Sequence, residues 1–278
     1  MNALLRVGWA WTPSVVVGFA IWTLLYQWSC RTSRATLGQQ IAFHFGTLVA
    51  LMALVSPLDV LGDDFLFSAH MVQHLLLIFV TAPLWLLGAP GQLVERVISE
   101  KVAGRARWLA DPRLAFFIFV GVLYVWHFPP IYNLAQESES VHIFEHLTFI
   151  GAAMVAWWPV AGVETSRLPK PAPALRMLYL FLLAIPCTFL AAVLTFAHEP
   201  LYAFYANAPH IFGLDALQDQ RLGGLLMWLP THLFLLLALG ITFFKWFVSV
   251  GRETEWRTAE NDGYAGEAFK KNMPELGV

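Results

Sequence analysis

The sequence is poor in charge. Asp, Glu, Lys and Arg together make up 13% of the 278 residues, whereas a soluble globular protein has about 25%. With 58% of its residues hydrophobic, the chain cannot cover a folded surface with polar side chains, which excludes an ordinary soluble domain. Apolar runs of about 20 residues, long enough to cross a bilayer, recur along the sequence. We therefore expect an all-α polytopic membrane protein.

Cysteine and nucleotide-binding motifs are also scarce. The two cysteines, Cys30 and Cys187, are far apart and lie inside or beside apolar runs, so the sequence has neither a disulfide framework nor a CxxC metal motif. No G-x-x-x-x-G-K-[ST] or G-x-G-x-x-G occurs, and nucleotide-driven transport has no support. The basic residues are accounted for by membrane topology, and nucleic acid is not an expected partner.

The apolar runs predict a bundle of seven transmembrane helices. We place them at residues 12–28, 37–56, 67–88, 113–128, 141–160, 174–196 and 222–247. Residues 1–250 then form one transmembrane domain, and residues 251–278 form a polar cytoplasmic tail. The first span is followed by arginines and has no good cleavage site, so we do not expect it to be a cleaved signal peptide.

The basic residues are distributed unequally between the two sides of the predicted bundle. Fifteen of the 17 lysines and arginines fall on one side, and only Arg6 and Arg221 fall on the other. The positive-inside rule therefore predicts that the N-terminus is outside and the C-terminus is cytoplasmic. The outer segments are instead acidic and include Asp59 and Asp63. We expect Arg221 to pair locally with Asp219, its neighbour but one.

Two similar histidine motifs stand at the outer ends of two predicted spans. They are HMVQHLLLI at residues 70–78 and HIFEHLTFI at residues 142–150, offset by 72 residues, and each follows a proline by thirteen residues. Side chains at positions i and i+4 share one face of a helix. We expect two such helices, each preceded by a proline stop and a short acidic loop, to run parallel and close together and to offer four imidazoles at one depth. Neutral imidazole binds Cu, Zn, Fe and Ni.

Other residues near the same depth could complete a metal site. His127 closes the fourth span, and Gln73 and Glu145 occupy equivalent positions in the two motifs. Amides and carboxylates commonly orient metal-bound histidines through the second imidazole nitrogen, which is the role expected of these two. The predicted ligands are His70, His74, His127, His142 and His146, with Met71, His198 and Met227 as possible additional ligands.

Four longer segments resemble a known family. They are FSAHMVQHLLLIFVTAPLWLLGAP at 67–90, YVWHFPPIYN at 124–133, VHIFEHLTFIGAAMVAWWPV at 141–160 and DQRLGGLLMWLP at 219–230. Together they resemble the CtaG family of cytochrome c oxidase assembly factors. The resemblance implies a seven-span protein of the bacterial inner membrane that is not an enzyme and that helps to supply copper to a haem–copper oxidase. An oxidase subunit or another copper chaperone would then be the partner.

Three alternatives remain open at this point. Facing histidines on two helices could ligate a haem b, which would make the protein a membrane redox protein. The sequence His142-Ile-Phe-Glu145-His146 matches the H-x-x-E-H signature, in which two histidines bind zinc and the glutamate is a general base, so a membrane zinc protease is a lesser alternative. Finally, outer aromatic residues such as Tyr132, Tyr202 and Tyr205 could dock another membrane complex without any metal.

Overall fold

The computed structural model describes residues 8–97, 111–165 and 168–261, and every regular element in these ranges is a helix. In chain order they are α1 (Pro13–Ser33), α2 (Leu37–Val55), α3 (Pro57–Asp64), α4 (Phe67–Leu75), the π-helix η2 (Leu76–Thr81), α5 (Ala82–Gly88), α6 (Gly91–Val97), α8 (Pro112–His127), α9 (Pro129–Glu137), α10 (Glu139–Ala161), α11 (Pro173–Thr195), α12 (Ala203–Asn207) and α13 (Ala216–Asn261). The predicted all-α fold class is confirmed.

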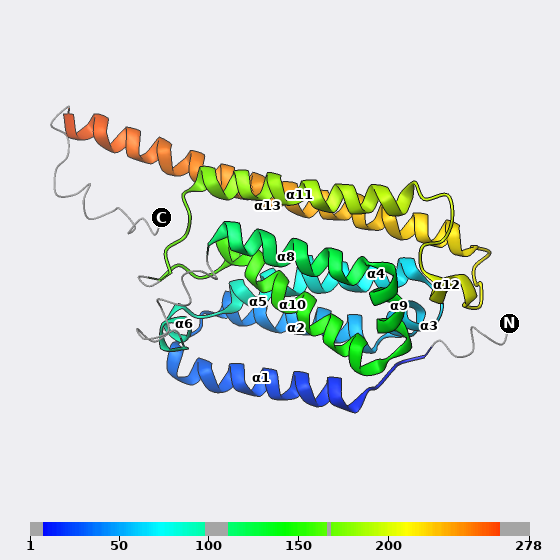
Figure 1. Ribbon diagram of the computed structural model, residues 1–278. Helices are drawn as coiled ribbons and strands as arrows, with labels where there is room; N and C mark the ends of the chain where they lie inside the picture. The colour runs from blue at the N-terminus through cyan, green and yellow to red at the C-terminus, as the bar shows by residue number, and fades with distance from the viewer. Residues whose placement is uncertain (1–7, 98–110, 166–167, 262–278) are drawn as a thin grey trace.

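The long helices lie side by side in one bundle (Figure 1). The short helices α3, α9 and α12 gather at the end of the bundle where α1 begins, and α6 lies at the opposite end (Figure 1). Helices α11 and α13 run along each other on one side of the bundle, and α1 lies on the other side. The chain therefore crosses from end to end repeatedly, as the predicted topology requires, while the membrane side of each end stays a prediction.

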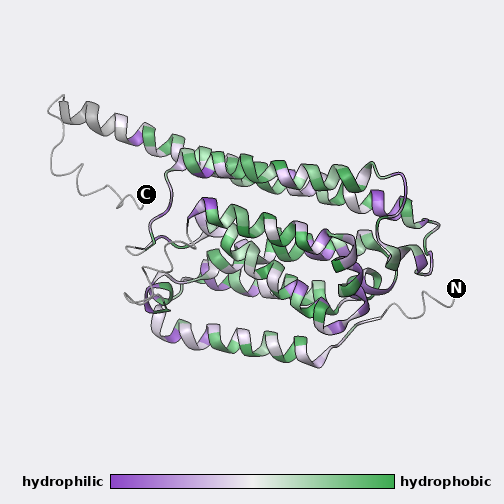
Figure 2. Cartoon of the chain, viewed as in Figure 1, coloured by the Kyte–Doolittle hydropathy of each residue, from purple (hydrophilic) through white to green (hydrophobic). Residues whose placement is uncertain are grey.

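Five helical segments among the described residues are long and apolar enough to cross a membrane, or six if the α8–α9 pair, bent by 72°, is counted as one broken span. The five are Leu37–Val55, Phe67–Gly88, Glu139–Ala161, Pro173–Thr195 and Ala216–Arg252. Helix α1, predicted as the first of seven spans, is not among them. Figure 2 shows why: apolar residues dominate α11 and α13, whereas α1 mixes apolar with polar residues.

The segments that follow Pro57 and Pro129 are helices α3 and α9. The expectation of short loops there is wrong. Proline is well suited to the first turn of a helix, because its missing N–H would be unpaired there in any case. In α3 the preceding residue, Ser56, also accepts a hydrogen bond from the backbone N–H of Leu58 at 3.3 Å. Each short helix thus leads from the end of one span to the start of a histidine helix.

Helix α4 is held at the centre of the bundle by close contacts with α3 and α13. A Cβ atom on Gly62 would lie 3.0 Å from the Cα of His70, and one on Gly223 would overlap the ring of Phe67. Asp219 of α13 accepts hydrogen bonds from the backbone N–H groups of Phe67 at 2.6 Å and Ser68 at 3.2 Å. Asp219 therefore supplies the N-terminal cap that α4 lacks in its own sequence.

The predicted pair of Asp219 with Arg221 is wrong. The Arg221 guanidinium donates instead to the carbonyl oxygen of Ala197 at 3.0 Å. Neighbours at i and i+2 on a helix point in different directions, so the Asp219 side chain reaches α4 while Arg221 reaches the end of α11.

Helix α4 continues into a π-helical turn that begins two residues after His74. The turn, η2, precedes Pro83, whose ring cannot donate to the ladder and disturbs the preceding turn. The carbonyl oxygen of Ile78 in this turn accepts a hydrogen bond from the indole of Trp157 on α10 at 2.8 Å. Such π-turns inside helices are frequent at functional sites.

At the other end of the chain, α13 continues to Asn261. The residues from 251 to 261, predicted to be part of a polar tail, are therefore helical. Residues 262–278 lie outside the described residues, and the division into a membrane domain and a tail stays a prediction.

Candidate metal centre

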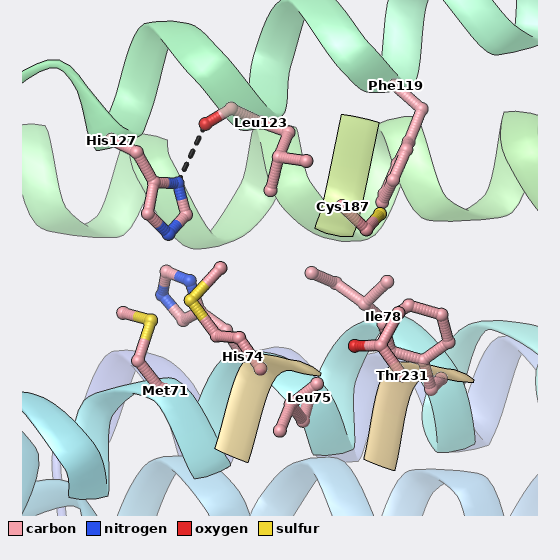
Figure 3. A pocket seen from close by; sticks show the side chains of 11 residues that line it. Met71, His74, Leu75, Ile78, Phe119, Leu123, His127, Cys187 and Thr231 are labelled. Atoms are coloured by element: carbon pink, nitrogen blue, oxygen red, sulfur yellow. Dashed lines mark hydrogen bonds between the residues drawn. The ribbon is translucent and has the colours of Figure 1, made fainter. Parts of the chain in front are cut away.

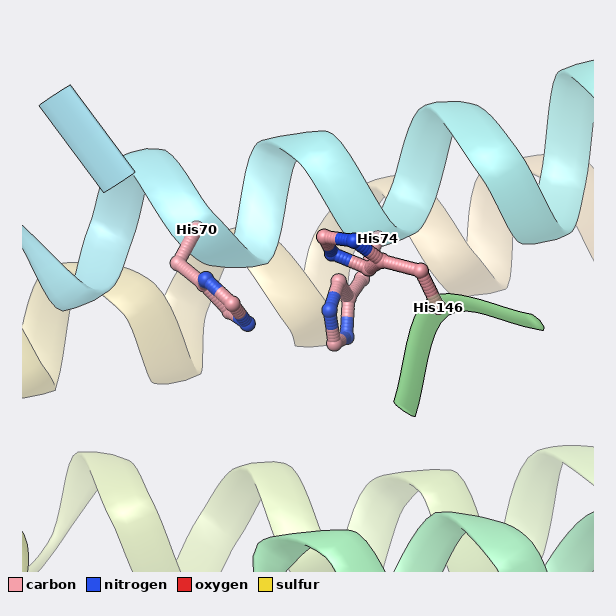
Figure 4. A group of neighbouring side chains, drawn as sticks. All are labelled: His70, His74 and His146. Atoms are coloured by element: carbon pink, nitrogen blue, oxygen red, sulfur yellow. The ribbon is translucent and has the colours of Figure 1, made fainter. Parts of the chain in front are cut away.

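The two histidine motifs meet between α4 and α10. The ring centroids of His70 and His142 are 5.3 Å apart, and those of His74 and His146 are 5.1 Å apart. Within each helix, the His70 and His74 rings lie 4.3 Å apart and the His142 and His146 rings 4.4 Å apart. Figure 4 shows His70 and His74 extending from α4 toward His146. The predicted contact between these two spans is confirmed.

The four rings differ in their exposure. His70 and His74 are 0% and 3% exposed, and His146 is 8% exposed. The side chain of His142, nearest the start of α10, is 14% exposed. The cluster therefore reaches from a partly open rim at His142 into the interior of the bundle.

Glu145 lies inside the cluster, facing the α4 histidines. Its side chain is fully buried, and its Oε1 atom is 3.9 Å from the Nε2 atoms of both His70 and His74. The sequence predicted that Glu145 would orient a metal-bound histidine through the second imidazole nitrogen, without contacting the metal. Its position between the two α4 rings instead makes it a candidate ligand that reaches across the helix interface.

Gln73, the counterpart of Glu145 in the other motif, points elsewhere. Its side-chain amide donates to Oδ1 of Asp59 at 2.6 Å and to the carbonyl oxygen of Ala53 at 3.0 Å. These contacts join α4 to α2 and α3. The two equivalent positions of the repeat thus have different surroundings, and Gln73 is placed to hold α4 rather than to orient an imidazole.

Asp63, at the end of α3, is a candidate ligand that the sequence interpretation missed. Its Oδ1 is 3.9 Å from Nδ1 of His70, and its Oδ2 is 3.6 Å from Nδ1 of His142. The sequence showed it only as one of several outer acidic residues. Its counterpart 72 residues later is Ala135, so the repeat gave no signal for it.

These side chains form two overlapping groups of potential metal ligands. One group is His70, His74 and His146, the other is Asp63, His70 and His142, and in each the ligand atoms lie within 4.8 Å of one another. Three ligand atoms bound to one ion at 2.0–2.1 Å lie about 3.3–3.6 Å from one another. Each ligand atom would therefore have to move by up to about 0.7 Å to close either group around an ion.

The potential ligand atoms of the cluster face one another, and most of them have no hydrogen-bond partner among the described residues. Eight buried nitrogen and oxygen atoms of His70, His74, His142, His146 and Glu145 have none among the described residues. An unpaired buried polar group costs about 1–3 kcal/mol. Eight such groups would together cost as much as the whole free energy of unfolding of a typical protein, which is roughly 5–15 kcal/mol. A carboxylate oxygen is an acceptor, and each neutral imidazole has one acceptor nitrogen and one N–H. Such a set suits a cation or protons placed between them.

The electrostatics at the rim also favour a cation. Asp59 lies on α3, outside the predicted spans, and burial together with the nearby charge of Asp63 raises its pKa to about 7. Since each carboxylate makes the other harder to ionise, a cation at the rim would relieve this repulsion. The acidic residues of α3 are thus arranged to attract positive charge toward His70 and His142.

The remaining predicted site residues separate into two sets. His127, Met71 and Met227 line a cavity next to His74, deeper in the bundle. His127 belongs to neither group of potential ligands described above. His198 is exposed in the turn after α11 and is not part of either group.

The three tyrosines that were predicted on the outer side pack over the site and are not free to dock another protein. Tyr132, Tyr202 and Tyr205 are at most 4% exposed. The ring of Tyr132 lies 5.7 Å from that of His70 and 4.1 Å from that of Tyr202. The hydroxyl of Tyr205 donates to the carbonyl oxygen of Gly62 at 2.6 Å. These side chains tie α3, α9 and α12 together, which removes the basis for a docking role of these tyrosines.

Comparison with known proteins adds a family and distant relatives. The sequence model of a family described as cytochrome c oxidase caa3 assembly factor (Caa3_CtaG) matches residues 14–249. The chain is 24% identical to an uncharacterised protein of Mycobacterium leprae, over 76% of this chain and 34% of that protein. It is 25% identical to an uncharacterised protein of Mycobacterium bovis, over 86% of this chain and 39% of that protein. The chain thus spans well under half the length of these relatives, and no solved structure matches it.

Proposed function

Because the chain belongs to the cytochrome c oxidase caa3 assembly factor family, we propose that it binds copper in its histidine cluster and delivers the ion during assembly of a haem–copper oxidase. It acts as a non-enzymatic chaperone in the bacterial cytoplasmic membrane. Its partner is an oxidase subunit or another copper chaperone on the outer side.

The observation that carries this proposal is the set of unpartnered polar atoms in the cluster. Four imidazoles and a buried carboxylate converge from two helices, and eight of their nitrogen and oxygen atoms have no hydrogen-bond partner among the described residues. Copper(II) is the divalent first-row metal that nitrogen and oxygen ligands bind most tightly. Zinc would fit the same ligands with lower affinity, so the family is the reason for choosing copper.

The arrangement also suits an ion that is passed on. Asp63 and His142 form a partly exposed rim, and His74, His146 and Glu145 form a buried interior. His70 belongs to both groups of potential ligands. An ion can therefore move between rim and interior by exchanging one or two ligands at a time, with His70 bound throughout. A partner that approaches the rim would compete for the ion there.

The two alternatives with other chemistry have less support. A haem b would need room for a porphyrin beside the rings, but the cavity next to His74 has a volume of about 30 Å³, which suits a single water or ion. A zinc protease would need Glu145 to reach a water and a peptide bond. Glu145 is instead fully buried and faces the rings of His70 and His74.

The proposal is tested by removing one histidine from each helix. The double variant His70→Ala/His146→Ala removes a ligand from both groups of potential ligands, so it should lose stoichiometric copper from the purified protein and should lower oxidase activity in membranes. The double variant His198→Ala/His210→Ala is the matched control, because both residues are exposed and belong to neither group of potential ligands. Immunoblots should show equal amounts of both variants in the membrane.

Two outcomes would contradict the proposal. If the His70→Ala/His146→Ala protein retains as much copper as the wild type, the cluster is not the binding site. If it loses copper while oxidase activity is unchanged, the ion has no part in oxidase assembly.

A further inference from the structure

A small cavity lies deeper in the bundle than the histidine cluster. It has a volume of about 30 Å³ and lies between α4, α8, α11 and α13. A cavity of this volume has room for a water molecule or an ion. Most of its wall is hydrocarbon, but His74, His127, Met71, Met227, Cys187 and Thr231 also line it. His74 is thus shared between this cavity and the outer cluster.

His127 presents an unpaired nitrogen in this cavity. Its Nδ1–H donates to the carbonyl oxygen of Leu123 at 2.7 Å, which leaves the lone pair on Nε2. The residue is 6% exposed, and Nε2 has no hydrogen-bond partner among the described residues. Figure 3 shows the ring pointing across the cavity toward His74 and Met71. An Nδ1–H bonded to a backbone carbonyl is the usual support of a histidine that binds metal through Nε2.

The other donors at this cavity are soft. Met71 and Met227 contribute thioethers, and Cys187 contributes a thiol. Methionine also fills gaps in apolar cores, which would account for the sulfur atoms on their own. It would not account for the unpaired His127 nitrogen that meets them. Thioether and imidazole donors together, with no carboxylate among the lining residues, select Cu(I) over divalent ions.

We propose that this cavity is a second copper site, specific for Cu(I), in which His127, Met71 and Met227 are the ligands. It rests on the proposed function in one respect, since copper reaches it as Cu(I) from the outer cluster through His74, without a change of oxidation state. The outer cluster offers carboxylate and imidazole, and the cavity offers imidazole and thioether. The protein thus holds its cargo in an inner site whose ligands suit the reduced ion, and it exchanges the ion at an outer rim.

The test uses the full-length protein, purified under reducing conditions and loaded with Cu(I). X-ray absorption should show both nitrogen and sulfur bound to the metal. The variant Met71→Leu/Met227→Leu nearly conserves side-chain volume. It should lose the sulfur signal and bind Cu(I) at least about tenfold more weakly in competition with a chelator. The control is Met52→Leu/Met154→Leu, whose methionines do not line the cavity and should leave both readouts unchanged.

A second variant separates this site from the outer cluster. His142→Ala/His146→Ala removes outer ligands but leaves the lining of the cavity intact, so it should retain one Cu(I) with sulfur bound. The proposal is overturned if the wild type shows only nitrogen and oxygen ligands, or if sulfur remains bound in Met71→Leu/Met227→Leu. It is also overturned if His142→Ala/His146→Ala loses the sulfur-bound ion. None of these results would by itself count against copper binding in the outer cluster, which is tested separately.

Discussion

The substitution Glu145→Gln should stabilise the metal-free protein and weaken its binding of copper. In the wild type, both carboxylate oxygens of Glu145 are buried without a partner, and Oε1 faces two imidazole nitrogens at 3.9 Å. A glutamine has the same shape, but its amide can donate a hydrogen bond to His70 or His74. Relieving one unpaired buried acceptor is worth about 1–2 kcal/mol.

That free energy converts into a measurable shift. For a protein of this size, 1 kcal/mol moves the melting temperature by about 2–4 °C, so Glu145→Gln should melt roughly 2–8 °C above the wild type without metal. Removing a charged ligand should also lower the affinity for copper by at least about tenfold. With copper in excess, bound ligand stabilises the wild type, and the order of melting temperatures should reverse.

The assay is thermal unfolding in detergent, with and without copper, on proteins first treated with a chelator. If Glu145 has only a structural role, glutamine should lower the melting temperature under both conditions by a similar amount. A lower melting temperature of the metal-free variant would refute the reasoning that unpaired acceptors are held together for a metal.

Three further predictions concern the carboxylates of α3 and the topology of the chain. Burial and Asp63 raise the pKa of Asp59 to about 7 from its usual value of 3.8, so the carboxyl holds its proton more tightly in the folded state, and stability is lost as pH rises from about 4 through about 7. Asp59→Asn cannot titrate, and its melting temperature in detergent should therefore exceed that of the metal-free wild type more at pH 8 than at pH 5; a constant difference would exclude this linkage. Asp63→Asn should weaken copper binding at least about tenfold in competition with a chelator, and an unchanged affinity would exclude Asp63 as a ligand. In a background without Cys30 and Cys187, cysteines introduced at Asn207 and Arg252 should react with impermeant reagents from opposite sides of the membrane, and labelling from one side would contradict the topology.

The sequence predicted the transmembrane helices well where they are long and uniformly apolar. The third span was placed at residues 67–88, and the structure has helical residues Phe67–Gly88 there. The prediction for α1 is confirmed only in part. Residues Pro13–Ser33 form a helix, but its mixed composition does not qualify it as a membrane span. The short helices α3 and α9 were missed because proline was interpreted as a stop signal, although it also starts helices.

The site was predictable to the extent that it depends on helical spacing. Histidines at i and i+4 had to share a face, and the repeat correctly indicated that the two pairs would meet. Asp63 was not predictable, because its position depends on how α3 folds back against α4 at Gly62. The repeat was also misleading for Gln73 and Glu145. The two equivalent positions have different neighbours because α4 also packs against α2 and α3, which Gln73 contacts. Glu145 on α10 instead faces the histidines of α4.

Direct observation of copper bound to imidazole tests the central claim. The purified protein should be loaded with one equivalent of Cu(II) and studied by pulsed electron paramagnetic resonance, which detects the nitrogen atoms of imidazole ligands. We predict coupling to at least two imidazoles in the wild type and in His198→Ala/His210→Ala, and loss of this signal in His70→Ala/His146→Ala, which removes a ligand from both groups. Wild-type protein that binds no copper, or a signal that survives in His70→Ala/His146→Ala, would contradict the claim.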